Sequence, residues 1–228
     1  MRSLTPRQFS SYCLAVDSAV RSNAVVVPLR PVSAPEVTKR VAIVDGALAC
    51  IAAKGLRLTT VDDVARASGM SRATLYRTIP GGREAIIQAT VETEVARFFS
   101  ALAVAMGAAN TLEAALVDGI TSSARWLSNS PALTTLLEVE PWVIMQHVSF
   151  GQMDRALALA VDFTGPFFGR WLEPAQAARA ADWAVRIVTS YLSNPSDTID
   201  LTDPIQVRDL LRQFVLPGVH ALQERNRS

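Results

Sequence analysis

The sequence is poor in the residues from which catalytic, redox and metal sites are built. It has two histidines and two cysteines, and Cys13 and Cys50 lie far apart without CxxC spacing. This supply supports neither a disulfide framework nor a cysteine-built metal site, and it is typical of the reducing cytoplasm. The GxSxG, HExxH, Walker and GxGxxG motifs are also missing. We therefore predict that the chain is not an enzyme and holds no cofactor or metal.

Long apolar runs are missing as well. No run approaches the roughly 18 apolar residues that a membrane-spanning helix needs. Polar residues such as Asp17 and Arg21 interrupt the candidates for a secretory signal. With 228 residues, of which 50% are hydrophobic and 19% charged, the chain is long enough for a buried core. These features predict a globular protein of the cytoplasm without membrane contact.

Charge is distributed unevenly, although the net charge is only +1. Residues 1–88 hold twelve Lys and Arg against six Asp and Glu, whereas residues 89–228 hold ten against fifteen. The asymmetry favours a basic module for an anionic partner, attached to an acidic body. Chance variation over a surface is the alternative that charge alone leaves open. Residues 1–32 show no helical period, so we expect a weakly ordered extension, either a mobile tail or an arm along phosphates.

Apolar spacing and capping residues predict three helices in the basic part, over residues 33–54, 61–67 and 72–78. Thr60 and Ser71 are suited to cap the second and third of these helices. Two short helices joined by a tight glycine turn form a helix-turn-helix, whose second helix can enter the major groove of DNA. Spacing alone also fits a structural helical hairpin within an all-α protein.

The third predicted helix carries residues suited to reading base edges. Arg72 has a fork that matches guanine O6 and N7, Ala73 adds no bulk, and Thr74 offers a hydroxyl and a methyl group. These three are the base-facing candidates, while Leu75 is expected to point into the core. The outer side chains and the two helix starts suit phosphate contact, which gives the candidates Thr60, Ser71, Tyr76 and Arg77.

The stretch from residue 55 to 87 resembles the DNA-binding signature of the TetR family of transcriptional regulators: GLRLTTVDDVARASGMSRATLYRTIPGGREAII. The resemblance is strongest from Val61 to Tyr76. Ile79 stands where the family usually has an aromatic residue, although it can still fill a core position. The connection before Arg83 is one residue longer than the family's, which leaves Arg83 in the place of a phosphate-binding lysine.

The resemblance implies an all-α fold with a DNA-binding domain over residues 33–82 and an effector-binding and dimerisation domain over residues 83–228. It also implies a homodimeric regulator, most often a repressor of palindromic double-stranded DNA. A small, largely apolar effector would tilt the long helix that follows the DNA-binding domain, and this tilt would release the protein from the operator. The competing interpretation is an all-α ligand carrier or enzyme without sequence-specific DNA binding.

The acidic body is predicted to be helical throughout, because no segment shows the alternation of apolar and polar residues that is typical of a strand. A long helix is expected first, with an apolar stripe that runs through Ile87 and Val91 to Met106. A break is expected at Gly165-Pro166. Glu138 and Glu140 fall on different sides of a predicted helix, so they form no acid–base pair.

Aromatic residues are concentrated after residue 88, where all four tryptophans lie. This concentration favours an aromatic-lined cavity for an apolar effector. The same helical spacing also fits a packed core, and His147 also fits a core histidine. The pocket candidates are Phe99, Trp126, Trp142, Met145, His147, Phe150, Phe167, Phe168, Trp171 and Trp183.

Two further helices are predicted from Pro174 to about Leu192 and from Pro204 to about Leu222, the second with a kink at Pro217. They are similar to the helix pair that forms the dimer interface in the TetR family. Their apolar stripes equally fit a pair buried within its own subunit. The interface candidates are Ala184, Val188, Tyr191, Leu211 and Phe214.

Overall fold

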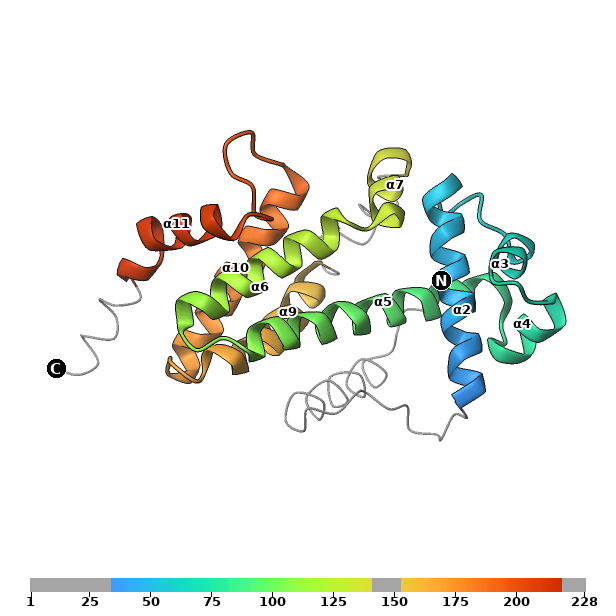
Figure 1. The fold of residues 1–228 in the computed structure, drawn as a ribbon, viewed down its shortest axis with the longest axis horizontal. Coiled ribbons are helices and arrows are strands. Elements are labelled where there is room, and N and C mark those ends of the chain that lie inside the picture. The colour runs from blue at the N-terminus through green and yellow to red at the C-terminus, as the bar shows by residue number, and fades with distance from the viewer. Residues whose placement is uncertain (1–33, 141–152, 219–228) are drawn as a thin grey trace. The chain divides into compact units, whose positions relative to one another are not determined.

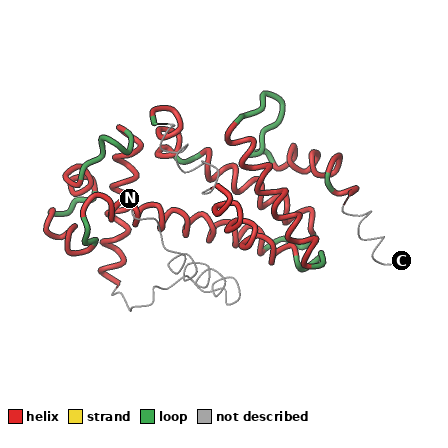
Figure 2. Tube along the Cα trace, turned by 180° about the vertical axis from the view of Figure 1, so that it is seen from behind, coloured by secondary structure: helices red, strands yellow, loops and turns green. Residues whose placement is uncertain are grey.

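The structure, a computed structural model, describes residues 34–140 and 153–218. In this part of the chain all regular structure is helical, as predicted, and Figure 2 shows helices and loops without a strand. The predicted extension of residues 1–32 and four pocket candidates lie outside the described residues, namely Trp142, Met145, His147 and Phe150. No helix among the described residues is both long and apolar enough to cross a membrane.

Nine α-helices lie in the described residues and carry the labels of Figure 1. They are α2 (Ala34–Lys54), α3 (Val61–Ala67), α4 (Arg72–Thr78), α5 (Gly82–Gly107), α6 (Leu112–Ser128), α7 (Pro131–Val139), α9 (Met153–Phe168), α10 (Pro174–Ser193) and α11 (Pro204–Phe214).

The described residues form two compact units. The N-terminal unit comprises residues 34–98 and 130–140, and the C-terminal unit comprises residues 99–129 and 153–218. The division falls within α5, and α7 belongs to the N-terminal unit although it follows α6 in the chain. Grouping by contact therefore adds a helix of the predicted body to the unit that holds the helix-turn-helix. The functional boundary between residues 82 and 83 remains a prediction.

The N-terminal unit has a small apolar core shared by four helices. Leu75 of α4 is fully buried in it, as its place in the spacing pattern predicts. Both α3 and α4 contact α2 and each other, which fixes the short helices on one longer support (Figure 1). Each of the short helices has only seven residues, too few to be stable alone, so this packing holds them. The core residues are Ile43, Ala47, Val64, Ala65, Leu75, Ile79, Ile86 and Ala89.

The C-terminal unit is a layered helical bundle. Helix α10 packs along α9 and also contacts α6, and α11 packs on α6 as well. The Arg125 guanidinium on α6 donates from Nε to the Thr202 carbonyl oxygen at 2.8 Å and ties the segment before α11 to this bundle. The largest fully buried side chains of the unit are Met106, Leu116, Val117, Ile120, Phe168, Val207 and Leu211.

Two details of the predicted body are wrong, and a third is correct within the described residues except for its position. Helix α9 passes through Gly165-Pro166, although Pro166 removes a backbone hydrogen bond and its ring crowds the preceding turn, because α9 packs along α10 over its length. The helix predicted from Pro204 to about Leu222 is interrupted at Val215, because α11 ends at Phe214 and residues 216–218 are helical again. The interruption lies two residues before Pro217, close to the predicted kink, and residues 219–222 lie outside the described residues. Val91 is 57% exposed, so the predicted apolar stripe of α5 does not follow its buried face there.

Candidate nucleic-acid interface

The turn between α3 and α4 is a Schellman motif. The Met70 amide donates to the Ala65 carbonyl oxygen at 2.9 Å, and the Gly69 amide donates to the Arg66 carbonyl oxygen at 3.2 Å. Gly69 has a φ of +68°, in the left-handed region that this motif requires and that glycine adopts without strain. The tight glycine turn expected from the sequence is therefore confirmed, and it sets the angle at which α4 leaves α3.

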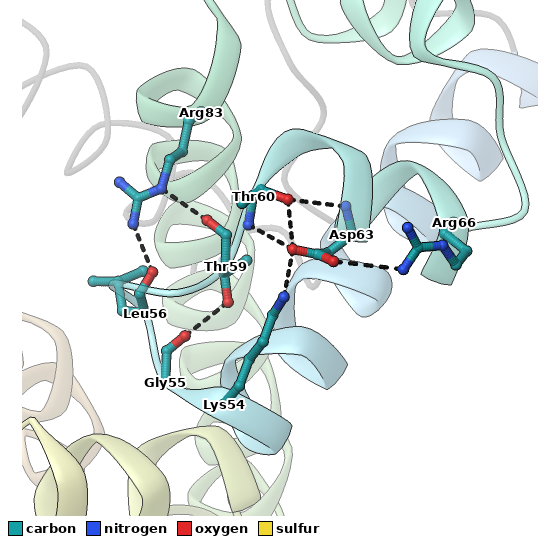
Figure 3. A network of polar contacts seen from close by, with 8 residues as sticks. All are labelled: Lys54, Gly55, Leu56, Thr59, Thr60, Asp63, Arg66 and Arg83. Carbon is teal, nitrogen blue, oxygen red and sulfur yellow. Dashed lines mark hydrogen bonds and ion pairs between the residues drawn. The ribbon is translucent and has the colours of Figure 1, made fainter.

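The start of α3 is held by a capping box, with Thr60 as the cap that the sequence predicts. The Asp63 amide donates to Thr60 Oγ1 at 3.2 Å, and the Thr60 amide donates to Asp63 Oδ2 at 3.1 Å. Lys54 at the end of α2 forms an ion pair with the same carboxylate, and Arg66 adds a second at 3.6 Å (Figure 3). The Lys54 ammonium, together with the Thr60 hydroxyl and amide, holds the pKa of the Asp63 carboxyl well below its usual range.

Helix α4 presents a polar face outward. Ser71 caps it by accepting from the Thr74 amide at 3.2 Å, and the two hydroxyl groups lie 3.0 Å apart. Arg72 and Ala73 are exposed and Thr74 is half-buried, so the three base-facing candidates share the outer surface of a helix whose Leu75 is buried. The phosphate-facing candidates Thr60, Ser71, Tyr76 and Arg77 are exposed as well. Their contacts with DNA remain predictions.

Arg72 has an acidic neighbour that the sequence analysis did not consider. Its guanidinium forms an ion pair with Asp62 on α3, with Nε 3.0 Å from one carboxylate oxygen and Nη1 3.4 Å from the other. Both side chains are more than half exposed, so water screens the pair and its contribution to stability is about 0–1 kcal/mol. The pair therefore orients the arginine without committing it to the protein.

Arg83 lies differently from the other phosphate-facing candidates. It is half-buried, and its guanidinium donates from Nε to the Thr59 carbonyl oxygen at 2.9 Å and from Nη2 to the Leu56 carbonyl oxygen at 2.6 Å (Figure 3). These bonds satisfy two acceptors of the α2–α3 loop, residues 55–60. Arg83 thus joins the start of α5 to the loop that leads into α3, and phosphate contact remains a second, predicted role.

Glu140 is the charged residue of this unit whose role the sequence analysis missed. It follows α7 directly, is 3% exposed, and accepts from the Leu56 amide at 2.8 Å and from the Arg57 amide at 3.0 and 3.2 Å. The contact joins residues more than eighty positions apart, and no local pattern encodes such a pairing. Gly55 accommodates the carboxylate, because a Cβ there would lie 3.1 Å from the Glu140 carboxyl carbon, but its φ of +83° already favours glycine and so does not signal the contact.

The described pocket candidates lie in the C-terminal unit, and part of the set is brought together. Phe99 and Phe163 have ring centroids 4.4 Å apart, and Phe163 and Phe167 have centroids 5.6 Å apart. Phe168 is fully buried, and Trp126, Trp171 and Trp183 are half-buried. Phe163 belongs to the same concentration of aromatic residues after residue 88, and it stands four residues before Phe167 on the same helical face. The cluster is an apolar interior that suits either a packed core or an apolar ligand.

The dimer-interface candidates differ in exposure. Leu211 is fully buried and Ala184 and Val188 are nearly so within the subunit, whereas Tyr191 is half-buried and Phe214 is 75% exposed. Among the described residues no cluster of three or more His, Cys, Asp or Glu side chains could hold a metal ion.

Comparisons with known proteins agree with this geometry. Residues 43–90 match the family model described as bacterial regulatory proteins, tetR family. The chain is also 31% identical over 163 residues to an uncharacterised HTH-type transcriptional regulator of Mycobacterium tuberculosis, present in two strains. That match covers 70% of this chain and 74% of the regulator.

Two solved structures are similar. One is the TetR family repressor AlkX of a Dietzia strain, implicated in biodegradation of n-alkanes, with a TM-score of 0.55, 26% identity, and coverage of 80% of this chain and 95% of that one. The other is the fatty acid degradation regulator FadR of Bacillus halodurans, with a TM-score of 0.53, 18% identity, and coverage of 76% and 94%. At 18% identity the second likeness concerns the fold alone.

Proposed function

The chain belongs to the TetR family of bacterial transcriptional regulators, and from this premise we propose that it is a repressor of palindromic operators, released by a small apolar effector. Membership makes it a DNA-binding regulator and not an enzyme, which removes the alternative of an all-α enzyme. The observation that carries the proposal is the outward face of α4, with Arg72 and Ala73 exposed above the buried Leu75.

Base reading is assigned to Arg72, Ala73 and Thr74. A bidentate contact of Arg72 with guanine O6 and N7 contributes about 1–3 kcal/mol of discrimination against another base. The ion pair with Asp62 is weak enough to be exchanged for this contact, since an exposed pair contributes at most about 1 kcal/mol. Ala73 is small enough to allow the helix to approach the base edges closely.

Phosphate contact is assigned to the rim of the same surface, at Thr60, Ser71, Tyr76 and Arg77. Each cation that neutralises a phosphate releases a counterion, so it steepens the salt dependence of binding without reading sequence. Arg83 can contact a phosphate only with the part of its guanidinium that is not hydrogen-bonded to the α2–α3 loop.

A homodimer is proposed because α4 has seven residues and alone reads too few base edges to compete with non-specific sites. Two copies related by a dyad read half-sites about 34–36 Å apart. The exposed Phe214 supports an α11 contribution to the interface. Val188, Ala184 and Leu211 are buried within the subunit and support it less.

The effector is proposed to be small and largely apolar. The cluster around Phe163 offers an apolar interior within the C-terminal unit, and the related Dietzia repressor is implicated in n-alkane biodegradation. Effector binding would favour a dimer geometry that no longer matches the operator, a coupling typically of about 1–3 kcal/mol. Titration of long-chain alkanes and fatty acids against tryptophan emission tests this part. No change across such a panel would argue for a packed core.

DNA binding itself is tested by the salt dependence of binding to duplexes. Replacing Arg77 by Ala should lower the slope of log K against log salt by about one, and weaken all duplexes alike. The matched control is Arg179→Ala, an exposed arginine on α10 in the C-terminal unit, which should leave the slope unchanged. A wild-type protein whose binding is insensitive to salt would contradict the proposal.

A further inference from the structure

The buried carboxylate of Glu140 has no part in the function proposed so far. Removing a carboxylate from water costs several kcal/mol unless hydrogen bonds replace the hydration. Here the replacement comes from the backbone amides of Leu56 and Arg57, at 2.8 to 3.2 Å. The pairing is specific, because two successive amides converge on one side chain that is 3% exposed.

Stability alone does not explain this charge. Helix α2 ends at Lys54, and the negative end of its dipole disfavours an anion beside the following loop. The ammonium of Lys54 is engaged by Asp63, and the guanidinium of Arg83 is engaged by two loop carbonyl groups. Buried ionic groups contribute less to stability than well-packed apolar residues of similar volume, and their best-supported use is to specify one arrangement.

The arrangement specified is that of the α2–α3 loop. The Glu140 carboxylate accepts hydrogen bonds from the amides of Leu56 and Arg57, and the Arg83 guanidinium donates hydrogen bonds to the carbonyl groups of Leu56 and Thr59. The Thr59 hydroxyl donates to the Gly55 carbonyl oxygen at 2.8 Å and closes the loop on itself. The residue after Thr59 is Thr60, which caps α3.

A second contact ties α7 to the same end of α2. The Thr135 hydroxyl donates to the Ala52 carbonyl oxygen at 2.8 Å, within the last turn of α2. Helix α7 therefore holds both the last turn of α2 and the loop that follows it, within one compact unit.

We propose that Glu140 is a positioning residue for DNA binding: by holding the Leu56 and Arg57 amides it fixes the loop that sets the start of α3, and through the Schellman turn the placement of α4. The inference rests on the DNA binding described under the proposed function. Glu140 lies at the end of α7, far from the helix-turn-helix in the sequence. It would therefore raise the affinity for the operator without contacting DNA.

The test compares Glu140→Gln with Glu138→Gln in the full-length protein. The two residues lie two positions apart and lose the same charge, but Glu138 is exposed and Glu140 is buried. The duplex is the one that wild-type protein enriches from a random pool. The expected result is about tenfold weaker binding or more for Glu140→Gln, as the loss of a charge-assisted hydrogen bond predicts, and no change for Glu138→Gln.

A second measurement separates positioning from mere stability. If the Glu140 contact improves DNA binding by some factor, then by linkage DNA binding must stabilise the contact by the same factor. Hydrogen exchange of the Leu56 and Arg57 amides should therefore slow when wild-type protein binds the duplex. This measurement needs no variant, so it tests the proposal even if Glu140→Gln fails to fold.

Each outcome supports or overturns the inference. Exchange at these two amides that is unchanged by DNA, or equal binding by the two variants beside a wild type that binds, would overturn it and leave the proposed function intact. A wild-type protein that retains no duplex would instead overturn the proposed function, and the inference with it. Slowed exchange together with selective loss of affinity in Glu140→Gln supports it.

Discussion

The two units place their proposed functional side chains in opposite ways. In the N-terminal unit Arg72, Ala73 and Arg77 are exposed, whereas in the C-terminal unit Phe99 and Phe168 are buried. The first unit is proposed to act through its surface and the second through its interior. Surface substitutions in the first should therefore change binding without changing the fold. In the second, changes to the proposed site are also changes to the core.

The largest effect is expected from Leu211→Asp on α11. Leu211 is fully buried, so the substitution buries an unpaired charge, which costs about 3–5 kcal/mol and should unfold the C-terminal unit. Thermal unfolding followed by tryptophan emission measures this. The matched variant is Phe214→Asp at a 75% exposed position, which should keep the fold and, if α11 contributes to the dimer, give monomers in sedimentation. A folded monomeric Leu211→Asp would reverse the roles assigned to the two residues.

Leu75→Ala should have the next largest effect and should be confined to the N-terminal unit. It leaves a cavity beneath α4, which costs about 2–5 kcal/mol, and binding to every duplex should fall with it. Hydrogen exchange of α3 and α4 amides is the measurement. Leu58→Ala is the control, because Leu58 is 57% exposed and its loss should stay within about 0.5 kcal/mol. Equal effects of the two changes would contradict the assigned core.

Arg72→Ala should leave stability unchanged and relax base preference at one position of each half-site. The expected loss is about 1–3 kcal/mol of discrimination, measured by competition between duplexes that differ at single base pairs. Arg66→Ala removes an arginine from the neighbouring helix, where the side chain is 79% exposed, and should not alter preference. Uniform weakening by Arg72→Ala would mean that this residue contacts phosphate instead.

Asp62→Asn should have the smallest effect and the opposite sign. It removes a negative charge from the proposed DNA-facing surface and the ion pair that Arg72 must give up for a base contact, so all duplexes should bind up to about 1 kcal/mol more tightly, with the largest gain where Arg72 contacts guanine. Glu84→Gln removes a charge from an exposed position of α5 and separates the general charge effect from the loss of the ion pair. Unchanged discrimination would show that the ion pair has no share in readout.

The same contrast between the units explains what could be predicted from the sequence. In the N-terminal unit the caps Thr60 and Ser71 and the turn at Gly69 are local signals, and the structure confirms each of them. Their positions follow from interactions across three to five residues. Interactions between residues close in the sequence set the ends of these helices and the turn between them, so the helix-turn-helix could be predicted from the sequence.

In the body the deciding interactions are not local. Helix α9 continues through Pro166 because its packing against α10 outweighs a single lost hydrogen bond. The proline by itself predicts a break, since the packing is not encoded near it in the sequence. The exposed Val91 shows that a helix with apolar residues on several sides does not identify its buried face. The contact of Glu140 with Leu56 depends on the packing of α7 against α2, which no spacing rule contains.

The central claim is that α4, presented twice by a symmetric dimer, reads base edges in a palindrome. Selection of bound duplexes from a random pool by the purified wild-type protein tests it most directly. The account predicts enrichment of two dyad-related half-sites about one helical turn apart, with retention that falls steeply as salt rises. Failure to enrich any sequence, at any salt concentration, would contradict it.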